Sequence, residues 1–422
     1  MRKLKFIDLF SGLGGFHVAL NELGHKCVFA SEINPDLRKL YFKNHGLECS
    51  GDINKIEISE IPDHNIICAG FPCQPFSKAG KQNGLNDPLN GSFFNKILEI
   101  ADYHKSEYLF LENVPNLKSH DNGETLKYMR DRLAQNYHYL DEIISPHFLG
   151  VPQNRSRIYI VCRRKEFGDL NHFNFPGKID VTNISIHNII EEDPKEFTSL
   201  KPETINKLKI WQEFIDHLDE DIPSFPIWAM EFGATYPYEE FTPSVMNLSE
   251  LASYKGKFGC RIDVSNKVNA IDSLPNYAQL NQVKFPNWKI RYIKQNRDFY
   301  KRNKHWLDGW LVKVKMWENS HLKFEWNCGK VTDKNIFDKI VQFRPSGIRV
   351  KLPNFSPTLV LTSTQIPVFP WLKRYMTVKE AAKLQCLERL KYYPDSNSNA
   401  FRAFGNAVNA CVVFKIAKKL IK

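Results

Sequence analysis

Within the first 165 residues, short apolar runs alternate with segments whose apolar residues recur every three or four positions. Residues 5–10 and 26–31 predict strands, and residues 16–23 between them predict a helix. Further apolar runs predict strands at 66–69, 107–111 and 157–162, and further helical spacing predicts helices at 93–101 and 126–133. Strands that alternate with helices are typical of α/β proteins with a mostly parallel sheet.

This alternation is lost from about residue 163 onward. Residues 166–343 contain many proline and aromatic residues and no clean period, which predicts a second, irregular domain. Near the end of the chain, helical spacing returns and predicts a C-terminal helix. We therefore expect a large α/β domain at 1–165, completed by 396–422, and a smaller domain with its hinge at 166–395.

A glycine-rich turn follows the first predicted strand, and an acidic residue follows the second. Gly12 and Gly14 lie in the turn, and Glu32 comes directly after residue 31. Glycines let the backbone approach a ligand closely, and a carboxylate can accept two hydrogen bonds from a ribose diol. The turn lacks the full spacing of a dinucleotide fingerprint, which favours an adenosine-type cofactor without a pyrophosphate. Taken alone, the turn would also suit an NAD-dependent oxidoreductase.

The turn after residues 66–69 holds a cysteine between two prolines, in the stretch Gly-Phe-Pro-Cys-Gln-Pro at 70–75. Proline fixes the backbone on either side of Cys73, and open α/β sheets place ligand chemistry at the carboxyl ends of their strands. A nucleophilic thiol needs such a fixed position, although a buried structural cysteine would also suit this turn. Glu112 ends another predicted strand, so we expect it at the same sheet edge as Cys73.

The charge of the chain indicates a polyanionic partner. The 422 residues include 58 Lys and Arg against 47 Asp and Glu, which gives a formal net charge of +11. Residues 285–315 alone contain nine Lys or Arg against two Asp, interleaved with aromatic residues. Cations contact phosphates, while aromatic side chains either stack on bases or form the core of the domain. A DNA-binding module without catalytic activity is therefore a further alternative.

Cysteine usage and hydropathy indicate the compartment. The nine cysteines are dispersed and form no C-x-x-C pair, which argues against a disulfide framework or a structural zinc site. No apolar stretch reaches the roughly 18 residues that a membrane span needs, and the N-terminus has no signal-peptide apolar region. We expect a soluble, cytoplasmic protein without a metal or a membrane partner.

Six stretches together resemble the DNA (cytosine-5-)-methyltransferases, in particular those of bacterial restriction–modification systems. They occur in the order and spacing of that family and lie within 1–165 and 344–422. They are FIDLFSGLGG at 6–15, GFPCQPFS at 70–77, LENV at 111–114, VPQNRSRIY at 151–159, RYMTVKE at 374–380 and FGNAV at 404–408. The resemblance implies a Rossmann-like S-adenosylmethionine-dependent methyltransferase domain with a second, smaller, irregular target-recognition domain.

The resemblance also implies catalytic roles. Cys73 would add to carbon 6 of a cytosine that is flipped out of duplex DNA, and Glu112 would protonate the neighbouring ring nitrogen. Arg155 and Arg157 would hold the flipped base and the nearby backbone.

For the remaining sites the resemblance implies a cofactor and DNA contacts. S-Adenosyl-L-methionine would donate the methyl group. Its site would be lined by Phe10, Gly12, Gly14, Glu32, Ile33, Asp52, Ile53, Pro72 and Asn406. The loop after Cys73 would close over the DNA, with contacts from Gln74, Ser77, Lys78, Lys81 and Gln82.

Two positions depart from the family pattern. Asn90 precedes Gly91 where an Arg-Gly pair is usual, and Ala407 stands where Ser is usual. Neither position is the nucleophile or the acid, so the expected reaction is unaffected.

The same motifs also serve tRNA cytosine-5 methyltransferases, but the long basic region at 166–343 favours DNA. We expect a monomer that acts on double-stranded DNA and is associated with the nucleoid. Enzymes of this family type commonly have a cognate restriction endonuclease that acts on the same site.

Overall fold

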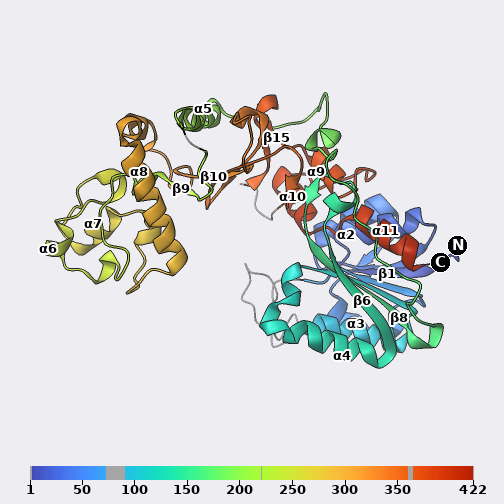
Figure 1. Cartoon of the computed structure of the whole chain (residues 1–422). Helices are drawn as coiled ribbons and strands as arrows, with labels where there is room; N and C mark the ends of the chain where they lie inside the picture. The colour runs from blue at the N-terminus through green and yellow to red at the C-terminus, as the bar shows by residue number, and fades with distance from the viewer. Residues whose placement is uncertain (1, 73–90, 220, 360–364, 422) are drawn as a thin grey trace. The chain divides into compact units, whose positions relative to one another are not determined.

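The computed structural model describes residues 2–72, 91–219, 221–359 and 365–421 (Figure 1). The chain divides into two compact units. Unit 1 consists of Met1–Glu196, Asn354–Ser363 and Thr377–Lys422, and unit 2 consists of Phe197–Pro353 and Thr364–Met376.

A sheet of seven strands forms the centre of unit 1 within the described residues. Its order is β3 (Cys49–Ser50), β2 (Lys26–Ser31), β1 (Lys5–Leu9), β4 (Ile66–Ala69), β5 (Tyr108–Asn113), β8 (Arg157–Arg164) and β6 (Tyr137–Ile144). Strands β1 to β5 pair in parallel, whereas β8 runs antiparallel to both β5 and β6. The strand order reverses between β1 and β4, and open α/β sheets bind ligands at such a point.

Helices cover both faces of this sheet. The described helices of unit 1 are α1 (Gly15–Glu22), α2 (Pro35–His45), α3 (Gly91–Tyr103), α4 (Glu124–Asn136), α9 (Val378–Leu384), α10 (Asn397–Asn406) and α11 (Ala410–Leu420). Because side chains alternate along a strand, Ile7 of β1 shares a core with α3 and α4, while Phe6 contacts His17 of α1. Helix α11 packs against α1, and Figure 1 shows α3 and α4 opposite α2 and α11.

These elements confirm the predicted α/β class. Strand β2 has the predicted bounds, and the ends of β1 and α1 lie within one residue of the predicted ones. Strand β5 continues through Glu112, which therefore lies within the strand and not after it. Strand β6 was not predicted from the sequence; its exposed positions include the apolar residues Leu140 and Ile143, so burial along it does not follow the polar and apolar pattern.

The division into units differs from the expected boundaries of 165/166 and 395/396. Residues 166–196, 354–363 and 377–395 belong to unit 1. The reason is a set of contacts between segments that are distant in the sequence.

Two of these contacts join Glu191 to the start of α9. Its main-chain N–H donates to the carboxylate of Glu380 over 2.9 Å, and the hydroxyl of Thr377 donates to the Glu191 carboxylate over 2.6 Å. In addition, strand β13 (Ser356–Pro357) pairs with strand β7 (Gln153–Asn154). The composition of a segment does not reveal that it pairs with another segment distant in the sequence.

Unit 2 contains its own sheet and helices. The sheet order is β15 (Arg374–Tyr375), β14 (Val368–Phe369), β11 (Ile340–Arg344), β12 (Gly347–Lys351), β10 (Lys323–Asn327) and β9 (Ile227–Trp228). Its described helices are α5 (Pro202–Asp216), α6 (Leu248–Leu251), α7 (Lys267–Asp272) and α8 (Asn287–Val314). Aromatic side chains of α5 and α8, among them Trp211 and Trp310, pack over the sheet and form the core.

Helix α8 has 28 residues and was not predicted. Its buried face includes Lys289, Asn296 and Arg297 among the apolar residues, so the apolar stripe that would reveal a helix is interrupted. Of the aromatic residues in this stretch, Phe299 and Trp310 are buried in the core, whereas Trp288 is half exposed. No helix in the described ranges, α8 included, has the length and apolar character to cross a membrane.

Two glycine substitutions should have opposite effects on the free energy of unfolding. A Cβ at Gly15 would lie 2.3 Å from the carbonyl oxygen of Val408, so Gly15→Ala should destabilise unit 1 by about 1–3 kcal/mol. Gly309 is exposed on α8 with open space around it, so Gly309→Ala should stabilise unit 2 by about 0.5–1 kcal/mol. Urea unfolding followed by circular dichroism measures both shifts. An unchanged midpoint for Gly15→Ala would contradict the close approach of Val408.

Candidate active site

The turn after β1 has an unusual backbone. Phe10, Gly12 and Gly14 have φ angles of 55°, 53° and 83°, in the left-handed region. At Gly14 a Cβ would lie only 2.4 Å from Nε2 of His45, so both conformation and space require glycine there. The ring of Phe10 contacts that of Phe93 edge to face, with a centroid distance of 5.0 Å. The turn therefore has a defined shape before any ligand binds.

Glu32, at the end of β2, is held by this turn. Its Oε2 accepts a hydrogen bond from the N–H of Gly12 over 3.0 Å, and its Oε1 accepts one from the N–H of Asn34 over 2.9 Å. The side chain is only half-buried. Each carboxylate oxygen has a second lone pair, so the oriented carboxylate can accept further hydrogen bonds from a ligand.

Parallel pairing brings three of the predicted cofactor residues to one edge of the sheet. The N–H of Ser11 donates to the carbonyl of Ser31, and the N–H of Glu32 donates to the carbonyl of Ser50, each over 3.0 Å. These bonds place the residues that follow β1, β2 and β3 side by side, namely Phe10, Glu32 and Asp52.

The neighbours of these residues differ in exposure. The carboxylate of Asp52 accepts a bond from the N–H of Asn54 over 3.0 Å, which orients it. Ile33 is 70% exposed, an unusual position for a large apolar residue, whereas Ile53 is buried. Of the two predicted isoleucines, the structure therefore leaves only Ile33 accessible to a ligand.

The segment between α10 and α11 lies against the same edge. Besides contacting Gly15, Val408 approaches Gly70, where a Cβ would lie 2.8 Å from its Cγ2 atom. The guanidinium of Arg155 donates to the carbonyls of Gly405 and Ala407, over 2.8 and 3.0 Å. Asn406 lies between these two carbonyls and is exposed. The predicted residue Asn406 thus lies near the turn that contains Gly14, although 392 positions separate the two in the numbering.

Glu112 of β5 is buried, with 7% of its surface exposed, and lies beside this edge. Nε of Arg157 is 3.1 Å from its Oε1, and a Cβ at Gly70 would lie 3.6 Å from its Oε2. Burial raises the pKa of the Glu112 carboxyl, and the positive charges of Arg157 and Arg155 lower it in opposition. The site therefore contains a carboxyl group that can hold a proton and that is fixed by an arginine.

Asn113, the neighbour of Glu112, was not predicted as a site residue. Its Nδ2 donates to the carbonyl of Phe71 over 3.4 Å and so connects the end of β5 to the turn after β4. Pro72, half-buried, is the last described residue of that turn. The predicted site residues Cys73, Gln74, Ser77, Lys78, Lys81 and Gln82 lie outside the described residues. In the described part of the chain, no group of three or more His, Cys, Asp or Glu side chains could hold a metal ion.

The sequence pattern of the C-5 cytosine-specific DNA methylases matches residues 4–422. The chain belongs to this family. The resemblance of the six stretches is thereby confirmed.

Individual relatives of this methylase support the assignment. The chain is 36% identical to the Type II methyltransferase M.MspI of Moraxella sp over 64% of its own length. It is 27% identical to the Type II methyltransferase M.AluI of Cellulosimicrobium cellulans over 100% of its own length and 92% of that protein. The matched segments cover 62%, 54% and 51% of three Type II relatives, so the chain spans about half to three fifths of their length.

The fold is also found in solved structures. A methyltransferase of Entamoeba histolytica superposes with a TM-score of 0.54 at 16% identity, over 100% of this chain and 98% of that one. At this level of identity the similarity concerns the fold alone.

Beneath the glycine turn, the methylase contains a buried polar cluster that the sequence analysis missed. The hydroxyl of Tyr41 donates to Oδ2 of Asp8 over 3.3 Å and lies 2.8 Å from Nδ1 of His17, whose ring stacks on that of His45. Burial and the nearby His45 lower the pKa of His17 to about 3, and burial raises the pKa of Asp8. In both cases burial favours the uncharged form, because a low-dielectric site disfavours charge.

The stability of the methylase should depend on pH through His17. The imidazole stays neutral in the folded protein down to a pH of about 3, whereas the unfolded chain binds a proton below 6.5. The contribution of His17 to stability is thus fully present above pH 6.5 and is lost as the pH is lowered toward 3, because only the unfolded state gains the proton. His17→Gln should show lower stability at neutral pH but a weaker pH dependence, measured as urea midpoints. An equally steep loss in this variant would contradict the assignment.

Proposed function

We propose that this methylase transfers the methyl group of S-adenosylmethionine to carbon 5 of a cytosine within a specific short sequence of duplex DNA. The observation that carries the proposal is the buried Glu112–Arg157 pair. It lies in contact with Gly70, three residues before Cys73 in the sequence. Activation of a cytosine ring requires a nucleophile, which Cys73 would supply, and a proton-holding carboxyl group, which Glu112 would supply.

The residues around the glycine turn suit S-adenosylmethionine. Glu32 would accept hydrogen bonds from the ribose hydroxyls with the lone pairs that Gly12 and Asn34 leave free. The exposed side chain of Ile33 would cover the adenine, and Asp52 would accept from its amino group. The bound cofactor would supply an electrophilic methyl group on a sulfonium.

In the proposed reaction, the chain's own residues prepare the cytosine. The thiolate of Cys73 forms a bond to carbon 6 while Glu112 gives its proton to ring nitrogen 3, so electron density moves to carbon 5. Carbon 5 then takes the methyl group. Loss of the carbon 5 proton to solvent and cleavage of the sulfur–carbon 6 bond restore the aromatic ring and release the Cys73 thiolate, and the proton on nitrogen 3 returns to the Glu112 carboxylate. The base must leave the duplex for these contacts to form.

The electrostatics of Glu112 support its role as the acid. Because burial raises the pKa of its carboxyl group, Glu112 retains a proton more readily than an exposed glutamate. The guanidinium of Arg157, 3.1 Å from Oε1, opposes this rise and fixes the orientation of the carboxyl group. The two effects together leave a proton donor at a defined position.

For Arg155 the geometry favours a positioning role. Its guanidinium donates to the carbonyls of Gly405 and Ala407, so it holds the segment that carries Asn406. Its predicted contact with the flipped base stays a prediction. Contacts of Gln74, Ser77, Lys78, Lys81 and Gln82 with DNA belong to the same proposal.

Unit 2 would recognise the target sequence. It contains the basic stretch 285–315, and cations of this kind contact phosphates. The relatives named Type II methyltransferases support a role in a restriction–modification system, with an endonuclease that cuts the same sequence when it is unmethylated.

Methylation mapping tests the function and the nucleophile together. The full-length protein is incubated with S-adenosylmethionine and mixed-sequence duplex DNA, and the product is sequenced after bisulfite treatment. We expect one cytosine within a recurring short sequence to be protected. Cys73→Ser should abolish this protection while DNA and cofactor binding stay close to wild type, because only the covalent step is removed.

Two outcomes would contradict the proposal. Substantial protection by Cys73→Ser would exclude the covalent mechanism. If the wild-type protein binds the cofactor but protects no cytosine in DNA, the same assay with tRNA would show whether tRNA is the substrate.

The pH dependence of the reaction tests the acid. Arg157→Gln removes the charge that lowers the pKa of Glu112, so this pKa should rise and the alkaline limb of the pH–rate profile should move to higher pH. The maximal rate should fall by about 10–100-fold, because the acid is weaker and less well oriented. Arg163→Gln is the matched control, since Arg163 lies on the same strand but faces Glu107. An alkaline limb that stays in place in Arg157→Gln would contradict the role of Glu112.

A further inference from the structure

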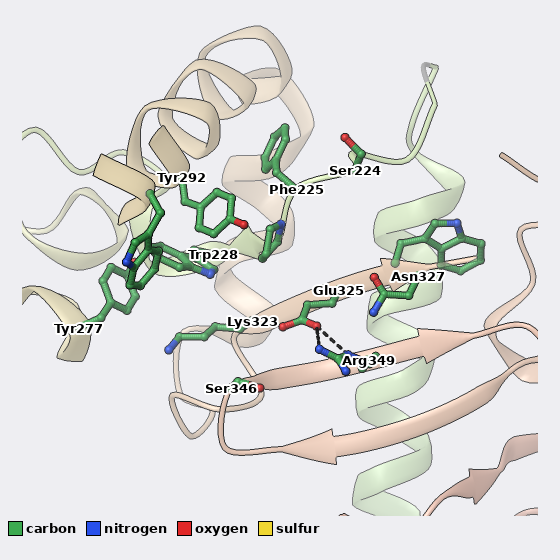
Figure 2. Close-up of a pocket in the computed structure, with 13 residues that line it drawn as sticks. Ser224, Phe225, Trp228, Tyr277, Tyr292, Lys323, Glu325, Asn327, Ser346 and Arg349 are labelled. Carbon is green, nitrogen blue, oxygen red and sulfur yellow. Dashed lines mark hydrogen bonds and ion pairs between the residues drawn. The ribbon is translucent and has the colours of Figure 1, made fainter. Parts of the chain in front are cut away.

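A cavity of about 500 Å³ opens in unit 2. Figure 2 shows Trp228, Tyr277 and Tyr292 on one side and Lys323 with the Glu325–Arg349 pair on the other. Trp288 also lines the cavity and is 51% exposed. A concave site with aromatic walls and a few convergent polar groups is typical of a ligand pocket.

Buried polar contacts hold the aromatic walls in place. The side chain of Asn296 accepts a hydrogen bond from the N–H of Trp228 over 2.7 Å and donates to the carbonyl of Pro226 over 2.9 Å. The hydroxyl of Tyr277 donates to Oε1 of Glu231 over 2.9 Å. Glu231 is fully buried and accepts a further bond from Nε of Arg297 over 2.9 Å. The walls are therefore fixed before a ligand arrives, as a binding site requires.

The opposite side of the cavity is a polar strip on two paired strands. Lys323, Glu325 and Asn327 alternate with apolar residues along β10 and share one face. Arg349 of β12 lies directly opposite Glu325; its Nε donates to Oε2 of Glu325 over 2.8 Å, and its Nη2 forms an ion pair with the same oxygen at 2.6 Å. Since both contacts end on Oε2, the Oε1 atom of Glu325 is left to accept a hydrogen bond from a ligand.

Besides the Glu325–Arg349 pair, the polar strip carries the positive charge of Lys323. Nζ of Lys323 lies 4.9 Å from the ring centroid of Tyr277, whose carbonyl accepts a hydrogen bond from Nζ of Lys289 over 2.8 Å. Burial and the charge of Lys289 lower the pKa of Lys323. The negative charge of Glu325 is already paired with Arg349. An anionic group beside Lys323 would offset the repulsion from Lys289, whereas a cationic ligand would add to it.

Together these features define the chemistry of the ligand. The aromatic faces suit a planar ring, Oε1 of Glu325 suits an exocyclic amino group, and the ammonium group of Lys323 suits a phosphate. A nucleotide combines all three. Paired bases in a duplex present only their edges to a protein, so aromatic faces can stack on a base only after it has left the helix.

We propose that this cavity binds a nucleotide of the DNA substrate whose base is unstacked, in addition to the cytosine that is methylated. The inference rests on the proposed function only in that DNA is the substrate. It assigns Trp288 and Tyr292 as stacking surfaces and Lys323 as a phosphate contact. Glu325 would accept from the amino group of the base.

Photocrosslinking tests the proposal directly. The full-length protein is mixed with duplex DNA in which single pyrimidines are replaced, one position at a time, by 5-iodouracil or 5-iodocytosine, and the irradiated complex is analysed by mass spectrometry. We expect a crosslink to Trp288, Tyr292 or Trp228 from a restricted set of positions. The crosslink should disappear in Trp288→Ala or move to Tyr292, and a large excess of single nucleotides should not suppress it.

Binding to the same DNA supplies a second readout, measured by fluorescence anisotropy. Trp288→Ala should weaken binding by about tenfold, as expected when one stacking surface is lost, and Trp288→Phe should restore most of the affinity. Phe241→Ala is the matched control, because Phe241 is an aromatic residue of unit 2 that is 38% exposed and does not line the cavity. It should bind as the wild type does.

The outcomes separate this inference from the proposed function. If bisulfite mapping shows methylation but no crosslink forms in the cavity and Trp288→Ala binds DNA normally, the inference is overturned and the proposed function stands. If the crosslink forms but no cytosine is methylated, the cavity is a nucleotide site and the proposed reaction fails. Crosslinking that single nucleotides suppress would overturn the assignment to DNA.

Discussion

The hydrogen bonds from Arg155 to the carbonyls of Gly405 and Ala407 join segments that are 250 residues apart. The C-terminal segment thereby lies against the glycine turn and the β4 turn, where Val408 approaches Gly15 and Gly70. Neither glycine could bear a side chain without displacing this segment. The buried guanidinium of Arg155 thus holds the candidate active site together. The site also depends on Gly15 and Gly70, because a side chain at either position would collide with Val408.

A second constraint is the balance of charge at the sheet edge. Glu112 is buried, which favours its protonated form, and two arginines oppose that effect. Asp8, on β1, is also buried but is bonded only to neutral groups such as Tyr41. Glu112, with its arginine partners, would act as the proton donor of the proposed reaction. Asp8, with its neutral partners, supports the glycine turn above it. In both cases the cost of burial is reduced by hydrogen bonds or by neutralisation.

In unit 2, buried polar side chains fix the positions of the residues around the cavity. Asn296 and Arg297 lie on the buried face of α8 and fix Trp228 and Glu231 through directional hydrogen bonds. Such bonds specify the orientation of an aromatic ring more narrowly than apolar contact does. Their consequence is a preformed cavity with aromatic walls on one side and a paired Glu325–Arg349 strip on the other.

The sequence by itself determined the α/β pattern of unit 1, the turn with Gly12 and Gly14, and Glu112 at the edge of the sheet. These features are encoded locally, because helical spacing, strand alternation and glycine turns depend on residues a few positions apart. The alternation of polar and apolar residues at 323–327 is a local signal of the same kind, and it indicates strand β10.

Only the tertiary structure decided the partners of Arg155, the division of the chain into units, helix α8 and the cavity in unit 2. Main-chain carbonyls accept hydrogen bonds whatever the residue type, so no sequence pattern marks Gly405 and Ala407 as partners of Arg155. Likewise, the residue types of Asn296 and Arg297 alone would place them at the surface of α8. Their burial follows from hydrogen bonds to Trp228 and Glu231, which are distant in the sequence. Contacts between residues that are distant in the sequence form only in the folded chain, so they produce no periodic pattern in the sequence.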